Sequence, residues 1–186
     1  AEEDIPNIGA VLQNNFANGR SMPERLLQSV VNFSTLAYLL RGDLAMDQAL
    51  FAEKTPLIDA AAPVAYVGGS QGGIMGGTTM AIAPNLERGV LVVGGANYSL
   101  MVWRSTAFSA INQIWAAHMP DPLEREFLFS IYQSAFDASD PAIYAEAIRS
   151  APLPGNGPRQ LLLVESIGDA QVPNVATEMM ARTYGM

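Results

Sequence analysis

The segment Gly68-Gly69-Ser70-Gln71-Gly72 directly follows the apolar run at 63–67. A strand that ends in the pattern G-x-S-x-G and continues as a helix makes a sharp turn, which lifts the serine hydroxyl clear of the sheet. We expect Gly68 and Gly72 to flank this turn, because glycine avoids Cβ clashes and tolerates a positive φ. The pattern therefore predicts a nucleophile elbow with Ser70 as the candidate nucleophile.

A packed membrane helix is the alternative for this segment. Gly68, Gly72 and Gly76 lie four residues apart in an uncharged stretch, the spacing of small residues in membrane helix pairs. Polar residues and prolines between Pro63 and Pro84 interrupt the roughly 20 mostly apolar residues that a span needs. The sequence instead favours a buried helix that follows the serine and ends at about residue 83.

Composition excludes several classes of function. The formal charge is −8 and the ten Lys and Arg residues are scattered, which argues against a nucleic acid or an anionic membrane as partner. The chain has no cysteine and one histidine, so neither a thiolate nor a zinc site is expected, and no cofactor motif is present. The charged fraction of 15% lies below the usual value of about 25%. We therefore expect apolar surface that self-associates or packs against another part of a longer parent chain.

The start of the chain leaves the compartment open. The acidic sequence Ala1-Glu2-Glu3-Asp4 lacks the basic and then apolar order of a signal peptide. We expect a soluble protein, which would be exported only if the parent carries an upstream signal.

The order of the predicted elements indicates an α/β fold. Apolar residues recur at helical spacing over 5–16 and again from Ser21 to Leu40, where Gly42 ends the second helix. Strands are predicted at 63–68, 89–94 and 160–165, the second of them buried on both faces. Strands that alternate with helices imply a parallel sheet.

We divide the chain, residues 1–186, into four parts of one partial domain. They are a helical lead-in (1–59), the elbow strand with its helix and the next strand (60–96), a helical cap insertion (97–158) and a last strand, turn and helix (159–186). The insertion carries two apolar stripes, Phe108, Ile111, Ile114 and Trp115, then Leu123, Phe127, Leu128, Ile131 and Phe136. These stripes form helix cores or line a substrate pocket, and both can hold at once.

Further candidate site residues, besides Ser70, lie in the last two parts. Tyr98 and Trp103 are expected to bind substrate. Asp169, in a turn just past the last strand, can reach the same sheet edge as Ser70 and orient an imidazole, or it can cap the helix near Pro173. The carboxylates of Asp137 and Asp140 are expected on helix surfaces as ordinary solvated charge.

Three segments resemble the α/β-hydrolase superfamily of serine esterases and lipases: GSQGGIMGG at 69–77, GGANYS at 94–99 and GDAQVPNVATE at 168–178. More narrowly, they are similar to a group of larger, mostly uncharacterised bacterial hydrolases. The resemblance implies an incomplete hydrolase sheet with a helical cap. It also implies that Ser70 attacks an ester carbonyl, that the Gln71 N–H holds the oxyanion and that Asp169 orients a histidine.

The chain departs from this family at the histidine. None follows Asp169, and the single histidine, His118, lies in the insertion ahead of the acid. No H-G-G-G-like loop precedes Ser70, and only three strands of about eight can be recognised, as the resemblance implies. We therefore expect an internal piece of a longer hydrolase, whose base is a histidine beyond Met186 or, less favoured, His118.

The resulting interpretation is a carboxylesterase-type serine hydrolase that forms an acyl-enzyme at Ser70. Its partner would be a small ester with an apolar part, and no cofactor or metal is expected. Without its base the isolated chain is expected to be a poor enzyme. A silent scaffold or binding module of hydrolase fold is one alternative, and an amidase or thioesterase is another.

Overall fold

The structure is a computed structural model that describes residues 16–186, so the helix expected at 5–16 lies almost wholly outside the described residues. The α-helices of the described range are α2 (Ser21–Leu39), α3 (Gln71–Ile82), α4 (Tyr98–Arg104), α5 (Ser109–His118), α6 (Pro122–Phe136), α7 (Ala145–Arg149) and α8 (Asn174–Tyr184). Short 3-10 helices are η1 (Phe16–Arg20), η2 (Asp43–Met46), η3 (Gln48–Leu50), η4 (Thr106–Phe108) and η5 (Pro141–Tyr144). No helix in the described range is both long and apolar enough to cross a membrane.

A parallel three-stranded sheet organises the molecule and confirms the expected α/β class. It consists of β3 (Val64–Gly69), β4 (Leu86–Val92) and β5 (Gln160–Val164), in the order β3-β4-β5. The strand expected at 89–94 starts and ends earlier, as β4. It includes the exposed charges Glu87 and Arg88, and it ends where Val93 takes a φ of 45°.

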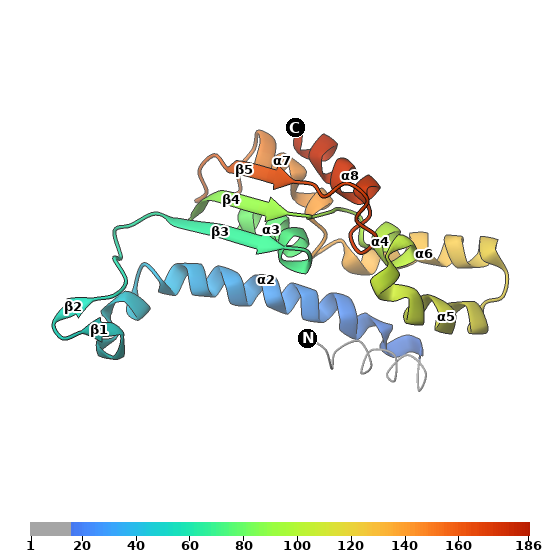
Figure 1. Ribbon diagram of the computed structural model, residues 1–186, viewed down its shortest axis with the longest axis horizontal. Coiled ribbons are helices and arrows are strands. Elements are labelled where there is room, and N and C mark those ends of the chain that lie inside the picture. The colour runs from blue at the N-terminus through green and yellow to red at the C-terminus, as the bar shows by residue number, and fades with distance from the viewer. Residues whose placement is uncertain (1–15) are drawn as a thin grey trace.

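The helix after the serine lies in the centre of the core. Almost every side chain of α3 after its first turn is buried, and Met80 packs with Leu91 of β4 and Met180 of α8. A Cβ at Gly73 would lie 2.6 Å from the Val92 oxygen and 3.0 Å from the Gly94 Cα, so the backbones of α3 and β4 approach closely. Figure 1 shows α3, α7 and α8 behind the sheet.

The opposite face of the sheet is not covered by any described helix (Figure 1). Val67, Val90 and Leu162 form one row across the strands in register. Val67 is 73% exposed and Leu162 58%, while Val90 is half-buried. The expectation that the middle strand is buried on both faces is therefore wrong for this outer face. Parallel sheets are normally covered on both sides.

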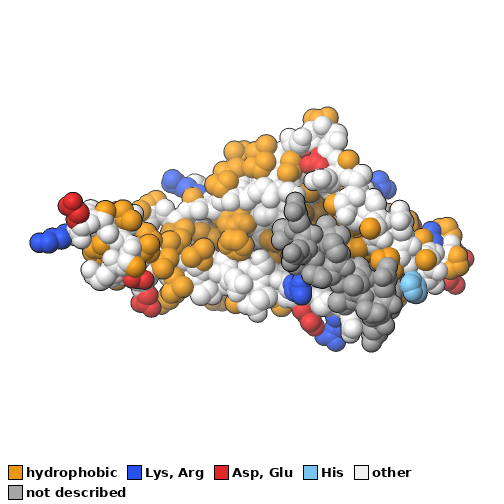
Figure 2. Space-filling view, turned by 60° about the horizontal axis from the view of Figure 1, so that its bottom comes forward, with side chains coloured by type: hydrophobic (Ala, Val, Ile, Leu, Met, Phe, Trp, Pro, Cys, Tyr) orange, Lys and Arg blue, Asp and Glu red, His pale blue; other side chains and the backbone are white. Residues whose placement is uncertain are grey.

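The helix expected from Ser21 is confirmed as α2, which ends before Gly42. It packs against α3 through Val30 and Ala37, and elsewhere on its surface it exposes the apolar side chains Leu27, Val31, Phe33, Leu36 and Tyr38. Figure 2 shows apolar side chains gathered over the C-terminal half of this helix. A small hairpin of β1 (Phe51–Ala52) and β2 (Thr55–Pro56), which the sequence did not predict, follows α2.

The insertion is helical as expected, and α5 and α6 form an arm beside the sheet (Figure 1). Ile111 and Trp115 of the first stripe are buried. The second stripe is wrong for Leu123, Phe127 and Ile131, which are all more than half exposed, whereas its last member, Phe136, is buried as expected. Phe129, which lies outside that stripe, is also buried, and the tilted ring of Trp115 packs against it at a centroid distance of 4.9 Å, so this contact sets which face of α6 turns inward.

The close approach of α3 to β4 predicts that Gly73→Ala lowers stability. Its Cβ would meet backbone atoms that cannot move independently, and overpacking of this kind costs about 1–3 kcal/mol in the free energy of unfolding. Gly72→Ala is the matched control, because its nearest foreign atom would lie 3.8 Å away and alanine favours a helix. Urea unfolding of both variants measures the difference. Equal midpoints would show that the backbone contact is not tight.

Candidate functional site

Ser70 occupies a strained turn between β3 and α3. Its backbone has φ 53° and ψ −119°, a positive-φ conformation that costs a non-glycine residue free energy and persists only where the surroundings hold it. Its N–H donates to the Val92 oxygen at 2.9 Å, and its carbonyl accepts from the Ile74 N–H at 3.0 Å. The predicted elbow is therefore present, with the serine solvent-exposed at the carboxyl end of its strand.

The glycines of the motif play different parts from those expected. The positive φ belongs to Ser70 itself, and neither Gly68 nor Gly72 has one. A Cβ at Gly68 would overlap the carbonyl of Gly72, so that position needs glycine for space. Gly72 has room for a side chain, and its carbonyl accepts a hydrogen bond from the Tyr66 hydroxyl at 2.7 Å.

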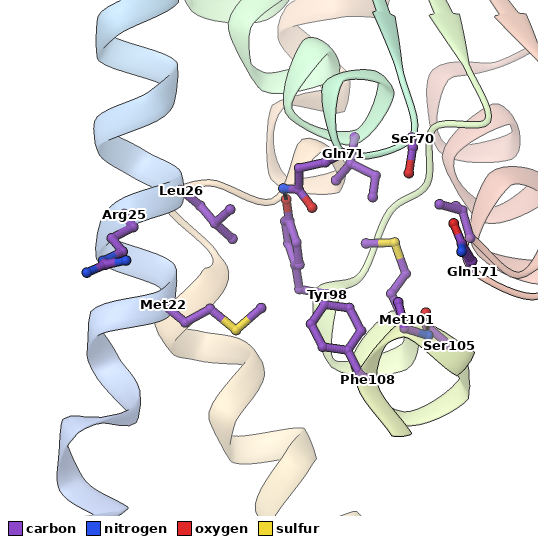
Figure 3. A pocket seen from close by; sticks show the side chains of 13 residues that line it. Met22, Arg25, Leu26, Ser70, Gln71, Tyr98, Met101, Ser105, Phe108 and Gln171 are labelled. Carbon is purple, nitrogen blue, oxygen red and sulfur yellow. Dashed lines mark hydrogen bonds between the residues drawn. The ribbon is translucent and has the colours of Figure 1, made fainter. Parts of the chain in front are cut away.

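A mostly apolar cavity of about 350 Å³ lies in front of Ser70. Segments far apart in the sequence line it: Met22, Arg25, Leu26, Ser70, Gln71, Ile74, Tyr98, Met101, Ser105, Ala107, Phe108, Gln171 and Val172. Figure 3 shows the hydroxyl of Ser70 and the side chains of Met22, Leu26 and Met101 directed into this space. The volume lies at the lower end of small-molecule sites, which are about 300–1,000 Å³ and mainly apolar.

Tyr98 forms part of the cavity wall, as the sequence analysis expected of a substrate-binding residue. Its hydroxyl accepts a hydrogen bond from the Gln71 amide at 2.9 Å and donates one to the Met75 sulfur at 2.8 Å. Burial raises the pKa of the Tyr98 phenol, the hydrogen bond from Gln71 lowers it and the nearby Asp140 carboxylate raises it again. The net shift is upward, so the phenol stays protonated at neutral pH and cannot act as a base.

Asp169 lies in the turn after β5 and shapes that turn. Its Oδ1 accepts hydrogen bonds from the N–H groups of Gln171 at 2.8 Å and Val172 at 3.0 Å. The interpretation as a helix cap is wrong, because α8 begins after Pro173 without a side-chain cap. Gln171 and Val172 line the cavity although Asp169 does not, so the acid holds a piece of the cavity wall.

Two other candidates lie away from this cavity. Trp103 packs in the insertion, with its ring 5.4 Å from that of Phe129 and the Arg125 guanidinium 5.8 Å from its centroid. His118 is the exposed last residue of α5, where its Nδ1 lies 2.8 Å from the Ile114 oxygen. Neither lines the space in front of Ser70. The structure thus joins Ser70, Gln71 and Tyr98 in one site, and it leaves Trp103 and His118 outside.

The expectation that Asp140 is a solvated charge on a helix surface is wrong, because its side chain is fully buried. Its carboxylate accepts four hydrogen bonds, from the N–H groups of Asn97, Tyr98 and Ala142 and from the Gln133 amide. Asp137 nearby is only half-buried. The residues missed by the sequence analysis also include Met22 and Leu26, although their spacing of four places both on one helix face.

Comparison of the chain with models of protein families, with curated proteins and with solved structures gives no match. The hydrolase interpretation consequently depends on the residues and geometry of the Ser70 cavity alone.

The turn at Asp169 generates a second prediction. Asp169→Ala removes the acceptor of two backbone N–H groups and should lower the free energy of unfolding by about 1–2 kcal/mol, because each lost intramolecular hydrogen bond costs about 0.5–1.5 kcal/mol. Asp169→Asn keeps an acceptor oxygen and should lose less than half as much. Denaturant titration compares the two variants. Equal losses would mean that charge, rather than the two hydrogen bonds, holds the turn.

Proposed function

We propose that the protein is a serine hydrolase of the carboxylesterase type, in which Ser70 attacks the carbonyl carbon of an ester with an apolar part. The observation that supports this most is the strained backbone of Ser70, which points a hydroxyl at an apolar cavity from the end of a parallel strand. Strain of this kind is concentrated at functional sites, and a strand-to-helix serine turn is the known device for exposing a nucleophile.

The N-terminal end of α3 is placed to stabilise the oxyanion that forms in the proposed reaction. Gln71 is the first residue of α3, so its N–H has no acceptor within the helix. The positive end of the helix dipole adds to its attraction for negative charge. In the proposed step, the serine oxygen bonds to the carbonyl carbon while the Gln71 N–H donates to the carbonyl oxygen.

The proposal requires a general base, because a serine hydroxyl alone is a weak nucleophile. No imidazole lines the cavity within residues 16–186. We infer that a histidine on further polypeptide supplies it, between Ser70 and Asp169. Both turn hydrogen bonds of Asp169 use Oδ1, so Oδ2 remains for the imidazole N–H.

The third prediction tests the nucleophile. A fluorophosphonate probe should phosphonylate Ser70, with loss of fluoride, and mass spectrometry should place the adduct on the peptide that contains it. The reaction of the isolated chain should be slow and should accelerate when free imidazole is added, because imidazole replaces the missing base. Ser70→Ala should abolish the adduct.

Ser166 provides the matched control, since it also follows a strand of the sheet but does not line the cavity. Ser166→Ala should label at the wild-type rate. Absence of labelling at Ser70 even with imidazole would contradict the hydrolase proposal. It would instead favour a silent binding module, which the lack of an imidazole in the described cavity also suits.

We also propose that the outer sheet face packs against another polypeptide, which is a second copy when the chain is alone. The row of Val67, Val90 and Leu162 is apolar and largely exposed, and the edges of such a sheet invite pairing.

The fourth prediction follows from this face. Val67→Lys should shift the chain toward monomer in sedimentation velocity, because a buried lysine charge opposes association. Ile143→Lys, at a 58% exposed position on η5, is the control and should associate as the wild type does. A wild-type chain that stays monomeric at high concentration would contradict self-association.

A further inference from the structure

The buried carboxylate of Asp140 lies inside the insertion, at the start of η5, and accepts hydrogen bonds from the start of α4. Its Oδ2 accepts from the Tyr98 N–H at 2.8 Å and from the Gln133 amide at 3.0 Å, while its Oδ1 accepts from the N–H groups of Asn97 at 3.2 Å and Ala142 at 2.9 Å. No Lys or Arg of the described residues forms an ion pair with it. The charge of the Asp140 carboxylate is therefore stabilised by hydrogen bonds from N–H groups. The same charge-assisted hydrogen bonds fix the positions of these N–H groups.

Two of the donors set the start of α4. Asn97 has a φ of 67°, an uncommon conformation for a residue with a side chain, and its Oδ1 caps the Leu100 N–H at 3.0 Å. Tyr98 follows, and its ring stacks on Phe136 at 5.0 Å with an interplanar angle of 12°. The carboxylate thus fixes the backbone from which the Tyr98 ring projects toward the cavity.

The Tyr98 hydroxyl carries this constraint to the elbow. It accepts the hydrogen bond from the Gln71 amide nitrogen, and Figure 3 shows that side chain reaching from the start of α3 to Tyr98, with the amide oxygen turned toward the cavity. Gln71 is the residue directly after Ser70. The contacts therefore run without a gap from Asp140 through Tyr98 to the elbow.

We propose that Asp140 is a positioning residue for the Ser70 site: it fixes Tyr98 through the backbone of α4, and Tyr98 fixes Gln71. The role in reactivity rests on the proposed hydrolase function, whereas the geometric coupling does not. A carboxylate is required because all of its neighbours are donors. In Asp140→Asn an NH2 group would replace one carboxylate oxygen. This donor would face the N–H groups that the oxygen accepts from now, and they would lose their acceptor.

A purely structural role has to be separated from this one, since Asp140 also caps η5 through the Ala142 N–H. The side-chain amide of Gln71 provides the readout, because a stability defect alone does not move its NMR signals in the folded protein. In Asp140→Asn these signals should move toward the positions that they take in Tyr98→Phe. Tyr98→Phe removes the hydroxyl, and with it the hydrogen bonds to Gln71 and to the Met75 sulfur, but it keeps the ring and the backbone N–H that donates to Asp140.

Reactivity provides the second readout. The rate of fluorophosphonate labelling at Ser70 in the presence of imidazole should fall about 10- to 100-fold in Asp140→Asn, as small misplacements at reacting centres do. It should fall similarly in Tyr98→Phe, and the double variant should fall no further, because both changes break one chain of contacts. Additive losses, or unmoved Gln71 signals, would overturn the proposal.

Asp137→Asn is the matched control. This variant also removes one negative charge, three residues before Asp140. In the wild type the Asp137 Oδ1 lies 3.4 Å from the Gln133 amide nitrogen and does not reach Tyr98. It should leave both readouts unchanged, and equal effects from Asp137→Asn would overturn the proposal. If Asp140→Asn does not fold, Gln133→Met removes one of the four donors, together with the acceptor of the Ser99 N–H in α4, and should move the Gln71 signals less, in the same direction. Moved signals without labelling at Ser70 would support the positioning and reject the hydrolase function.

Discussion

The contact between Gly73 of α3 and Gly94 after β4 is the constraint on which the rest of the structure depends. A Cβ at Gly94 would lie 2.8 Å from the Gly73 oxygen, so helix and strand touch backbone to backbone. This approach places the Val92 carbonyl within reach of the Ser70 N–H. The hydrogen bond in turn holds Ser70 at a φ that it would otherwise leave. The strained serine is thus a consequence of how closely α3 packs on the sheet.

The cavity extends this constraint to segments that are far apart in the sequence. The start of α3 fixes Gln71, α2 contributes Met22 and the turn held by Asp169 closes another side. Tyr98 is the member that connects this apolar wall to buried charge, through the N–H that donates to Asp140. A buried carboxylate is costly unless donors surround it, and here four do. The same hydrogen bonds fix one arrangement of the cavity wall at Tyr98. Apolar contacts alone would specify that arrangement less well.

The parts predicted from the sequence are those that local patterns determine. The elbow, the three strands and α2 follow from turn chemistry and periodicity, and the structure confirms them. Tertiary packing decided the rest. The buried face of α6 depends on where Trp115 lies, and the exposure of Val67 depends on what covers the sheet. Asp140 could not be recognised, because only the fold brings its donors together from Asn97 to Ala142.

The exposed outer face and the cavity without an imidazole are connected by geometry. The outer face includes the row of Gly69, Val92 and Val164 at the carboxyl ends of the strands, directly before Ser70. A polypeptide layer that covered this face would therefore end next to the serine. A parallel sheet needs such a layer for burial, and a serine nucleophile needs a base at the same edge. One additional segment can meet both needs, which is why we place the proposed histidine on the polypeptide that covers this face.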